Sequence, residues 1–136
     1  MQATIINDQL IAYRHRKNGG GPCVVFANSL GSDQSLWDDV IVHLSGGFDT
    51  LTYDMRGHGL SGLSHDFTVA DLADDLIALM EQLALSNVIL CGVSLGGMVA
   101  QCVAAQRGDL LQAVIFIQHG VKDRQPNKME RAYRSH

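Results

Sequence analysis

Apolar residues along the chain fall in short runs separated by polar segments, and the period within each run predicts a strand or a helix. Short continuous apolar runs rich in Val and Ile are typical of strands buried on both faces of a parallel sheet. Strands are predicted at residues 4–6, 10–14, 23–27, 50–54, 88–91 and 113–117. The first two flank Asn7, Asp8 and Gln9, residue types that favour a hairpin turn.

Between the later strands, apolar residues recur every three or four positions, which predicts amphipathic helices. Ser32 and Asp33 can cap the first of these helices. Its apolar positions are Leu36, Trp37, Val40, Ile41 and Leu44. We expect Leu36 and Trp37 to pack in the core rather than to line a pocket.

A second helix is predicted to begin at Thr68, which stands three residues before Asp71 as in a capping box. Its apolar stripe comprises Val69, Leu72, Leu76, Met80 and Leu83. Asp71, Asp74 and Asp75 lie in its first turns, where carboxylates interact favourably with the helix dipole. We expect these three carboxylates to face solvent and to take no part in catalysis.

A third helix, small and apolar, follows the strand at 88–91 and is predicted to end at Arg107 and Gly108. The elements therefore run as a strand pair followed by alternating strands and helices. That order predicts an α/β protein with a doubly wound, mostly parallel sheet.

Composition limits the classes to which the protein can belong. A chain of 136 residues with 46% apolar content has room for one domain. No apolar run is as long as a membrane span and the first twenty residues lack a signal-peptide pattern, so we expect a cytoplasmic protein without a membrane partner. Cys23, Cys91 and Cys102 form no Cys-x-x-Cys pair and are expected to be reduced core residues. The histidines show no metal-ligand spacing, and neither a metal nor a cofactor is predicted.

Charge is distributed unevenly along the chain. Residues 119–136 hold five basic and two acidic residues, a net charge of +3, so the total of −4 leaves −7 on residues 1–118. An acidic main part argues against nucleic acid as a partner. The only apolar residues of the last segment are Val121, Met129, Ala132 and Tyr133. We therefore expect a domain over 1–118 and a basic, poorly ordered tail over 119–136.

The clearest chemical signal is the motif Gly92-x-Ser94-x-Gly96, which stands between an apolar strand and a small, apolar helix. The spacing alone occurs by chance in roughly 5% of chains of this length, so the strand-to-helix context carries the assignment. A turn this sharp strains the serine and lifts its hydroxyl clear of the sheet, and side chains at 92 and 96 would collide with the neighbouring strand and helix. The helix also opens with unpaired N–H groups that can receive negative charge. Ser94 is therefore predicted to be a nucleophile.

Two loops after neighbouring strands are further candidates. Parallel strands place their carboxyl ends at one edge of a sheet, where α/β proteins build their sites. Asn28-Ser29-Leu30-Gly31 follows the strand at 23–27, and a loop dense in glycine and charge, residues 55–62, follows the strand at 50–54.

From about residue 3 to residue 117 these features together resemble the α/β-hydrolase family. The elbow at 92–97, the loop Asp54-x-Arg56-Gly57-x-Gly59-x-Ser61 and the loop at 28–31 occur in the order and at the intervals of that family. With Trp37-Asp38 and residues 95–101, the loop at 28–31 is most similar to the 3-oxoadipate enol-lactonases of the β-ketoadipate pathway. Related esterases and carbon-carbon bond hydrolases share most of these residues.

The resemblance implies a role for each matching residue. Ser94 would be the nucleophile, flanked by the elbow glycines Gly92 and Gly96, and the backbone N–H groups of Leu30 and Leu95 would form the oxyanion hole. The loop-bracing residues would be Asp54, Arg56 and His58. The implied reaction is the hydrolysis of a small carboxylic ester or lactone, most specifically 3-oxoadipate enol-lactone, without a cofactor.

The chain departs from the family in its last part. The family supplies its acid and histidine later, after a lid that follows the strand matching 113–117. Only nineteen residues follow Ile117, so we expect a chain truncated before the lid and the final strands, and weakly active or inactive. Asp123 and His136 stand in the family's order but in no strand-to-loop context, and His119 is expected to be an exposed loop residue. The alternative is a non-catalytic half domain that binds a partner or itself through the exposed edge of the strand at 113–117.

Overall fold

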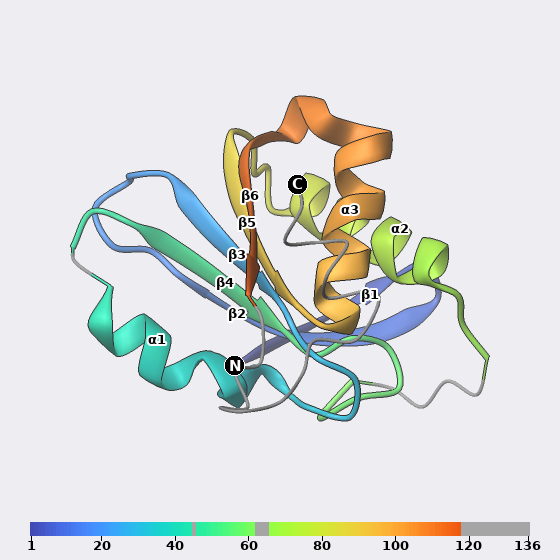
Figure 1. The fold of residues 1–136 in the computed structure, drawn as a ribbon. Coiled ribbons are helices and arrows are strands. Elements are labelled where there is room, and N and C mark those ends of the chain that lie inside the picture. Colours follow the sequence, from blue (N-terminus) through green and yellow to red (C-terminus); the bar gives the residue numbers. More distant parts are fainter. Residues whose placement is uncertain (45, 62–65, 118–136) are drawn as a thin grey trace, which may run out of the picture.

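A computed structural model describes residues 1–44, 46–61 and 66–117, which form one six-stranded sheet flanked by helices (Figure 1). The strands are β1 (Gln2–Ile6), β2 (Gln9–Arg16), β3 (Cys23–Ala27), β4 (Asp49–Tyr53), β5 (Val88–Val93) and β6 (Leu111–Ile117). Their spatial order is β1-β2-β4-β3-β5-β6. The first two are antiparallel to their neighbours, whereas β4, β3, β5 and β6 are parallel. The predicted α/β fold is confirmed, and the predicted tail over 119–136 lies outside the described residues.

The β1–β2 hairpin turns where the sequence predicts. Asn7 and Asp8 both have positive φ, 49° and 64°, and two consecutive residues of this kind are typical of a type I′ turn. Asn and Asp adopt this conformation more readily than other side chains except glycine. The turn pairs Ile6 with Gln9 and fixes the register of the two strands.

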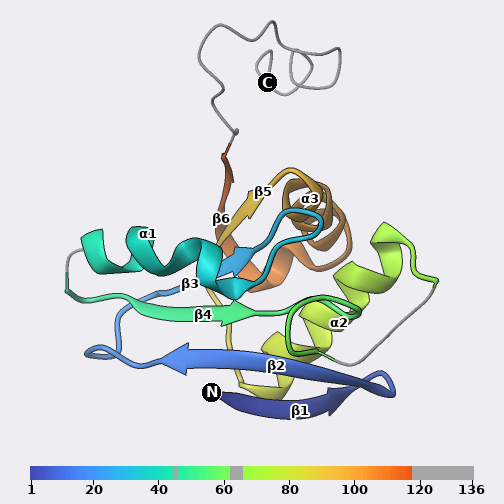
Figure 2. The same cartoon turned by 90° about the horizontal axis from the view of Figure 1, so that it is seen from below.

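Helices cover both faces of the sheet (Figures 1 and 2). The helix α2 (Val69–Gln82) and the helix α3 (Leu95–Arg107) lie on one face, and the 3₁₀ turn η1 (Gln34–Trp37) and the helix α1 (Asp38–His43) lie on the other. A short 3₁₀ turn, η2 (Gly108–Leu110), joins α3 to β6. Alternate strand residues pack on opposite faces. Val25, Leu51 and Leu90 pack in the core with α2 and α3, whereas Val24, Phe26 and Cys91 pack with Trp37.

The first predicted helix is shorter and less buried than its sequence indicates. Trp37 is buried as expected, but Leu36 and Val40 are 38% and 39% exposed, so the prediction that Leu36 packs in the core is wrong. The segment begins as a 3₁₀ turn and continues as six α-helical residues. A 3₁₀ turn has about 3.0 residues per turn instead of 3.6, so a stripe spaced for an α-helix does not stay on one face.

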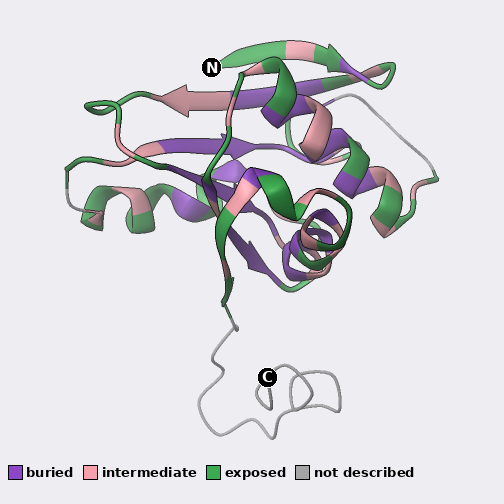
Figure 3. Cartoon of the chain, turned by 90° about the horizontal axis from the view of Figure 1, so that it is seen from above, coloured by how far each residue is buried: buried purple, intermediate pink, exposed green. Residues whose placement is uncertain are grey.

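Burial is concentrated in the central strands and on the inner sides of α2 and α3 (Figure 3). Cys23 and Cys91 are buried there with free thiols, as predicted, whereas Cys102 is only half-buried. The edge strand β6 is largely exposed, and Ile115 is the most exposed of its large apolar residues. Within the described residues, the sheet is therefore well covered from β2 to β5 and poorly covered at β6.

Candidate active site

Ser94 stands alone between β5, which ends at Val93, and α3, which begins at Leu95. Its φ of 54° and ψ of −117° place a residue with a side chain in a region that is otherwise almost restricted to glycine. Ser94 is exposed although its neighbour Val93 is buried. The sharp strand-to-helix turn therefore presents the serine at the carboxyl edge of the sheet.

The glycines around Ser94 are required by close backbone packing. A Cβ at Gly92 would lie 2.4 Å from the carbonyl oxygen of Gly96, and a Cβ at Gly96 would lie 2.0 Å from the carbonyl oxygen of Ala27. Neither clash can be relieved by a side-chain movement, because both involve backbone atoms. At Gly97 the nearest atom would be 3.5 Å away, an ordinary contact. The first turn of α3 is thus fitted directly against the end of β3.

The same turn of α3 supplies backbone donors beside the serine. The N–H groups of Gly97 and Met98 donate to the carbonyl of Ser94 at 2.9 and 3.2 Å. The N–H groups of Leu95 and Gly96 open the helix and have no acceptor within it. They carry the positive end of the helix dipole, which favours an anion at this position.

The loop after β3 contains a tight turn over Ser29, Leu30, Gly31 and Ser32. The backbone N–H of Ser32 donates to the carbonyl of Ser29 at 3.3 Å, and its hydroxyl donates to the same oxygen at 2.7 Å. Gly31 has a φ of 74°, as the third residue of a type II turn requires. Leu30 is the second residue, 69% exposed, and its N–H takes no part in closing the turn.

Asn28 fixes the start of this loop, a role that sequence analysis missed. Its side chain is buried, donates from Nδ2 to the carbonyl of Tyr53 at 2.8 Å, and accepts at Oδ1 from Nε1 of Trp37 at 2.6 Å. The available signal was a buried-type strand that ends at once in an amide side chain, with an indole nine residues later.

Asp54, which directly follows β4, connects the loop after β3 to the loop after β4. Its carboxylate is buried, with Oδ1 accepting from the N–H of Gln34 at 2.8 Å and Oδ2 accepting from the N–H of Leu60 at 2.9 Å. Ser61 donates from its hydroxyl to the carbonyl of Asp54 at 2.6 Å. These contacts join the segment after β3 to both ends of the loop after β4, and none of them reaches Ser94.

Arg56 pairs with Asp75, so the prediction that Asp75 faces solvent is wrong. Arg56 donates from Nε to Oδ2 and from Nη2 to Oδ1 of that carboxylate, both at 2.7 Å, and Nδ2 of Asn7 donates to Oδ1 at 3.1 Å. Asp75 lies one turn from Leu72 and Leu79, on the inner side of α2, and is buried. The hydrogen bonds to Asp75 raise the pKa of the Arg56 guanidinium, so the guanidinium remains charged.

The other acids of α2 match the prediction more closely. Asp71 and Thr68 form the reciprocal capping box, with Thr68 Oγ1 accepting from the Asp71 N–H and the Asp71 carboxylate accepting from the Thr68 N–H. The backbone hydrogen bond from Thr68 lowers the pKa of Asp71. Asp74 is exposed. Burial therefore distinguishes Asp75 from both neighbours, although the three are alike in sequence.

Among the described residues, no side chain forms a hydrogen bond with the hydroxyl of Ser94. His58 donates from Nδ1 to the carbonyl of Arg56 at 3.0 Å, and its ring lies 6.0 Å from that of Phe67. His119, Asp123 and His136 lie outside the described residues. The site as described thus has an exposed serine and backbone donors, but no base in contact with the serine.

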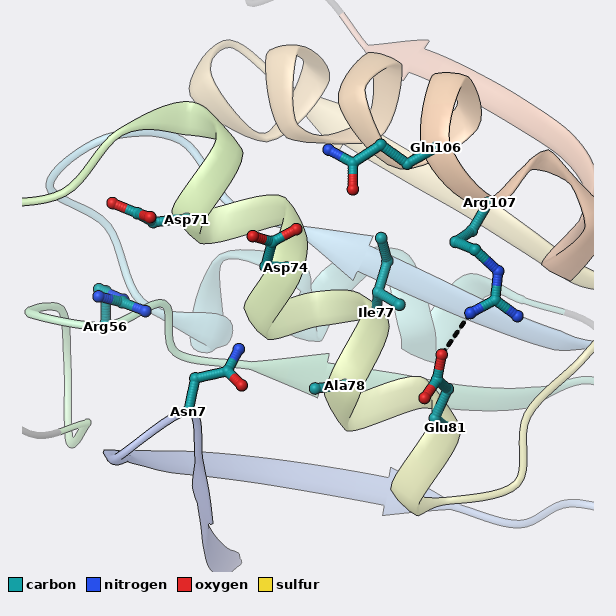
Figure 4. Close-up of a pocket in the computed structure, with 9 residues that line it drawn as sticks. All are labelled: Asn7, Arg56, Asp71, Asp74, Ile77, Ala78, Glu81, Gln106 and Arg107. Atoms are coloured by element: carbon teal, nitrogen blue, oxygen red, sulfur yellow. Dashed lines mark hydrogen bonds and ion pairs between the residues drawn. The ribbon is translucent and has the colours of Figure 1, made fainter.

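A groove of about 500 Å³ between α2 and α3 is separate from this site (Figure 4). Its lining residues are Asn7, Arg56, Asp71, Asp74, Ile77, Ala78, Glu81, Gln106 and Arg107. Figure 4 shows Arg107 reaching from the end of α3 to Glu81 on α2, where the two form an ion pair. None of these residues belongs to the elbow or to the loop after β3.

The described ranges contain neither a metal-binding cluster nor a membrane-spanning helix. There, no group of three or more His, Cys, Asp and Glu side chains is arranged to hold a metal ion. Nor does any helix in this part of the chain combine the length and apolar character needed to cross a membrane.

Comparison with known proteins identifies the family. A sequence model of the α/β-hydrolase fold matches residues 22–133. The chain belongs to the α/β-hydrolase family. Among solved structures, an enol-lactonase from Burkholderia xenovorans superposes with a TM-score of 0.79 at 34% identity over 83% of this chain and 45% of its own. The resemblance seen in the sequence is confirmed.

The chain is also similar to two curated relatives. The 3-oxoadipate enol-lactonase 1 of Acinetobacter baylyi is 35% identical over 79 residues, which are 58% of this chain and 30% of that protein. The 2-(acetamidomethylene)succinate hydrolase of Mesorhizobium japonicum is 33% identical over 127 residues, 86% of this chain and 46% of that protein. The chain thus spans less than half the length of these relatives.

Proposed function

We propose that Ser94 is the nucleophile of a hydrolase that acts on a small carboxylic ester or lactone. The observation that carries the proposal is the exposed, positive-φ serine at a strand-to-helix turn whose glycines cannot be replaced without backbone clashes. A backbone conformation this unfavourable persists where the surrounding structure imposes it, and such residues concentrate at functional sites.

The chemistry follows from the groups around the serine. The Ser94 oxygen attacks the substrate carbonyl carbon, and its proton passes to a base. The N–H groups of Leu30 and Leu95 stabilise the negative charge that develops on the carbonyl oxygen. Collapse of the tetrahedral intermediate expels the leaving alcohol or enol, and water then hydrolyses the acyl-enzyme to release the acid.

Within this class we propose 3-oxoadipate enol-lactone as the substrate. The support is the similarity to two proteins whose names state enol-lactonase activity, together with the segment Asn28-Ser29-Leu30-Gly31. An enol-lactone is an activated acyl donor because its leaving group is a stabilised enolate, so its opening needs no cofactor. Braced loops at Asp54, Arg56 and His58 would keep the site rigid during the reaction.

None of the described residues is a base in contact with Ser94 that could receive this proton. Because a serine hydroxyl stays protonated at neutral pH without such a base, turnover by the 136-residue chain should be weak. The test is to assay the purified chain on p-nitrophenyl acetate and on enol-lactone beside Ser94→Ala and His136→Ala. Turnover that Ser94→Ala leaves unchanged would contradict the nucleophile, and strong turnover lost in both variants would identify His136 as the base.

The second candidate is a non-catalytic half domain that associates through β6. The observation in its favour is that Ile115 and Ile117 are exposed on a strand at the edge of the sheet. Exposed apolar edge strands favour pairing with another chain. Size-exclusion chromatography with light scattering tests this candidate, since a monomer with a cooperative melting transition would contradict it.

A further inference from the structure

Asn28 and Trp37 form a fully buried hydrogen-bonded pair next to the candidate site. The indole N–H of Trp37 donates to Oδ1 of Asn28 at 2.6 Å, and Nδ2 of Asn28 donates to the carbonyl of Tyr53 at 2.8 Å. The two residues, Asn28 and Trp37, are 1% and 2% exposed. The pair therefore connects the end of β3, the end of β4 and the turn η1 through direct hydrogen bonds.

The amide side chain of Asn28 satisfies both partners at once. The Trp37 indole can only donate and the Tyr53 carbonyl can only accept, so residue 28 must offer one acceptor and one donor side by side. An aspartate would direct a carboxylate oxygen at the Tyr53 carbonyl, and an apolar residue would leave two buried groups without partners. The requirement therefore concerns the hydrogen-bonding groups of residue 28 as well as its size.

The pair closes the loop that carries Leu30. The loop starts at Asn28 and ends at η1, where the N–H of Gln34 donates to the buried carboxylate of Asp54. Between these anchors lies the turn with Leu30 and Gly31 at its centre. On the other side of Asn28 lies α3, since a Cβ at Gly96 would approach the Asn28 carbonyl oxygen to 2.7 Å. Asn28 is thus the shared support of the Leu30 turn and of the helix that follows Ser94.

We infer that Asn28 and Trp37 are positioning residues that hold the Leu30 N–H in place as an oxyanion donor. The inference rests on the proposed function of Ser94 and assigns the pair a role in that function. Trp37 also packs on Phe26, with ring centroids 4.7 Å apart. Trp37 would have a purely structural role if this packing were its whole contribution. The two roles can be separated, because Trp37→Phe removes the indole N–H but keeps an aromatic ring, whereas Phe26→Leu removes the ring contact but keeps the N–H.

The test uses phenylboronic acid and amide NMR on the ¹⁵N-labelled chain. The Ser94 oxygen adds to boron and its proton is released to solvent, which gives a negatively charged tetrahedral adduct that resembles the intermediate of ester hydrolysis. In the unsubstituted chain, the Leu30 and Leu95 amide signals should both move on addition of the acid. In Trp37→Phe and Asn28→Asp, the Leu95 signal should still move but the Leu30 signal should not, and affinity for the acid should fall by about tenfold to a hundredfold.

The control variant decides between positioning and packing. Phe26→Leu should lower stability yet leave both amide responses and the affinity unchanged. If Trp37→Phe keeps the Leu30 response, or if Phe26→Leu loses it equally, the positioning role is overturned. If neither amide responds in the unsubstituted chain, or if Ser94→Ala responds as strongly, the proposed nucleophile itself fails and the positioning role with it. The two kinds of failure are therefore distinguishable.

Discussion

Arg56 and Asp75 form a two-point ion pair that anchors the loop after β4 to the inner side of α2. Both hydrogen bonds are 2.7 Å long, and the side chains of Arg56 and Asp75 are 13% and 2% exposed. The side-chain amide of Asn7 also donates to the Asp75 carboxylate, which links the β1–β2 turn to the same group. One buried charge therefore holds three segments that are far apart in sequence.

Loss of this carboxylate should destabilise the fold strongly. Asp75→Asn removes the carboxylate that is hydrogen-bonded to the nearly buried Arg56 guanidinium and leaves only the more distant Asp71 and Asp74 to offset its charge, so the free energy of unfolding should fall by about 3–5 kcal/mol. Asp74→Asn changes the adjacent, exposed acid and should alter it by less than about 0.5 kcal/mol. Urea unfolding followed by circular dichroism compares the two. Equal effects would show that the pair contributes no more than a surface charge.

The elbow glycines provide a second matched comparison. Gly96→Ala places a Cβ 2.0 Å from the carbonyl oxygen of Ala27, and we expect at least about 3 kcal/mol of destabilisation or a failure to fold. Gly97→Ala meets only ordinary contacts and should raise stability by up to about 1 kcal/mol through helix propensity. Thermal unfolding of both variants measures these two changes in stability. A tolerated Gly96→Ala would mean that the end of β3 and the start of α3 are not packed as described.

Buried thiols should make stability depend on alkaline pH. Burial raises the pKa of Cys91 to about 11 and, with a smaller contribution from Asp49, that of Cys23 to about 12, from an ordinary value near 9. The folded state then binds protons more tightly than the unfolded state, so its stability is complete below about pH 9 and falls as pH rises toward 11 or 12.

Urea titrations between pH 8 and pH 11 measure this dependence. Cys91→Ala and Cys23→Ala should each give a shallower fall in stability with pH than the unsubstituted chain. A slope that is the same in all three proteins would contradict the assignment of the dependence to buried thiols.

Local sequence patterns were sufficient for most of the fold. The continuous apolar runs predicted the central parallel strands, the Asn7-Asp8 turn predicted the hairpin, and Thr68 with Asp71 predicted the start of α2. These features depend on residues close in sequence, so periodicity and turn chemistry determine them. The strand-to-helix context of Ser94 was predictable for the same reason.

The errors concern contacts between distant residues. Nothing near Asp75 in sequence reveals that Arg56 will reach it, so its carboxylate was grouped with Asp71 and Asp74. Leu36 was misplaced because the change from a 3₁₀ turn to an α-helix shifts the phase of the stripe. The bond between Asn28 and Trp37 joins a loop to the turn that follows it, and only the folded chain brings them together.

The reactivity of Ser94 toward a fluorophosphonate tests the central claim most directly. The serine oxygen attacks phosphorus and fluoride leaves. Because no described base contacts Ser94, added imidazole can accept the serine proton. Peptide mass spectrometry of the labelled 136-residue chain should find the adduct on Ser94, formed faster with imidazole and absent from Ser94→Ala. Labelling of exposed Ser35 at the same rate as Ser94, or an unmodified Ser94 with imidazole present, would contradict the account.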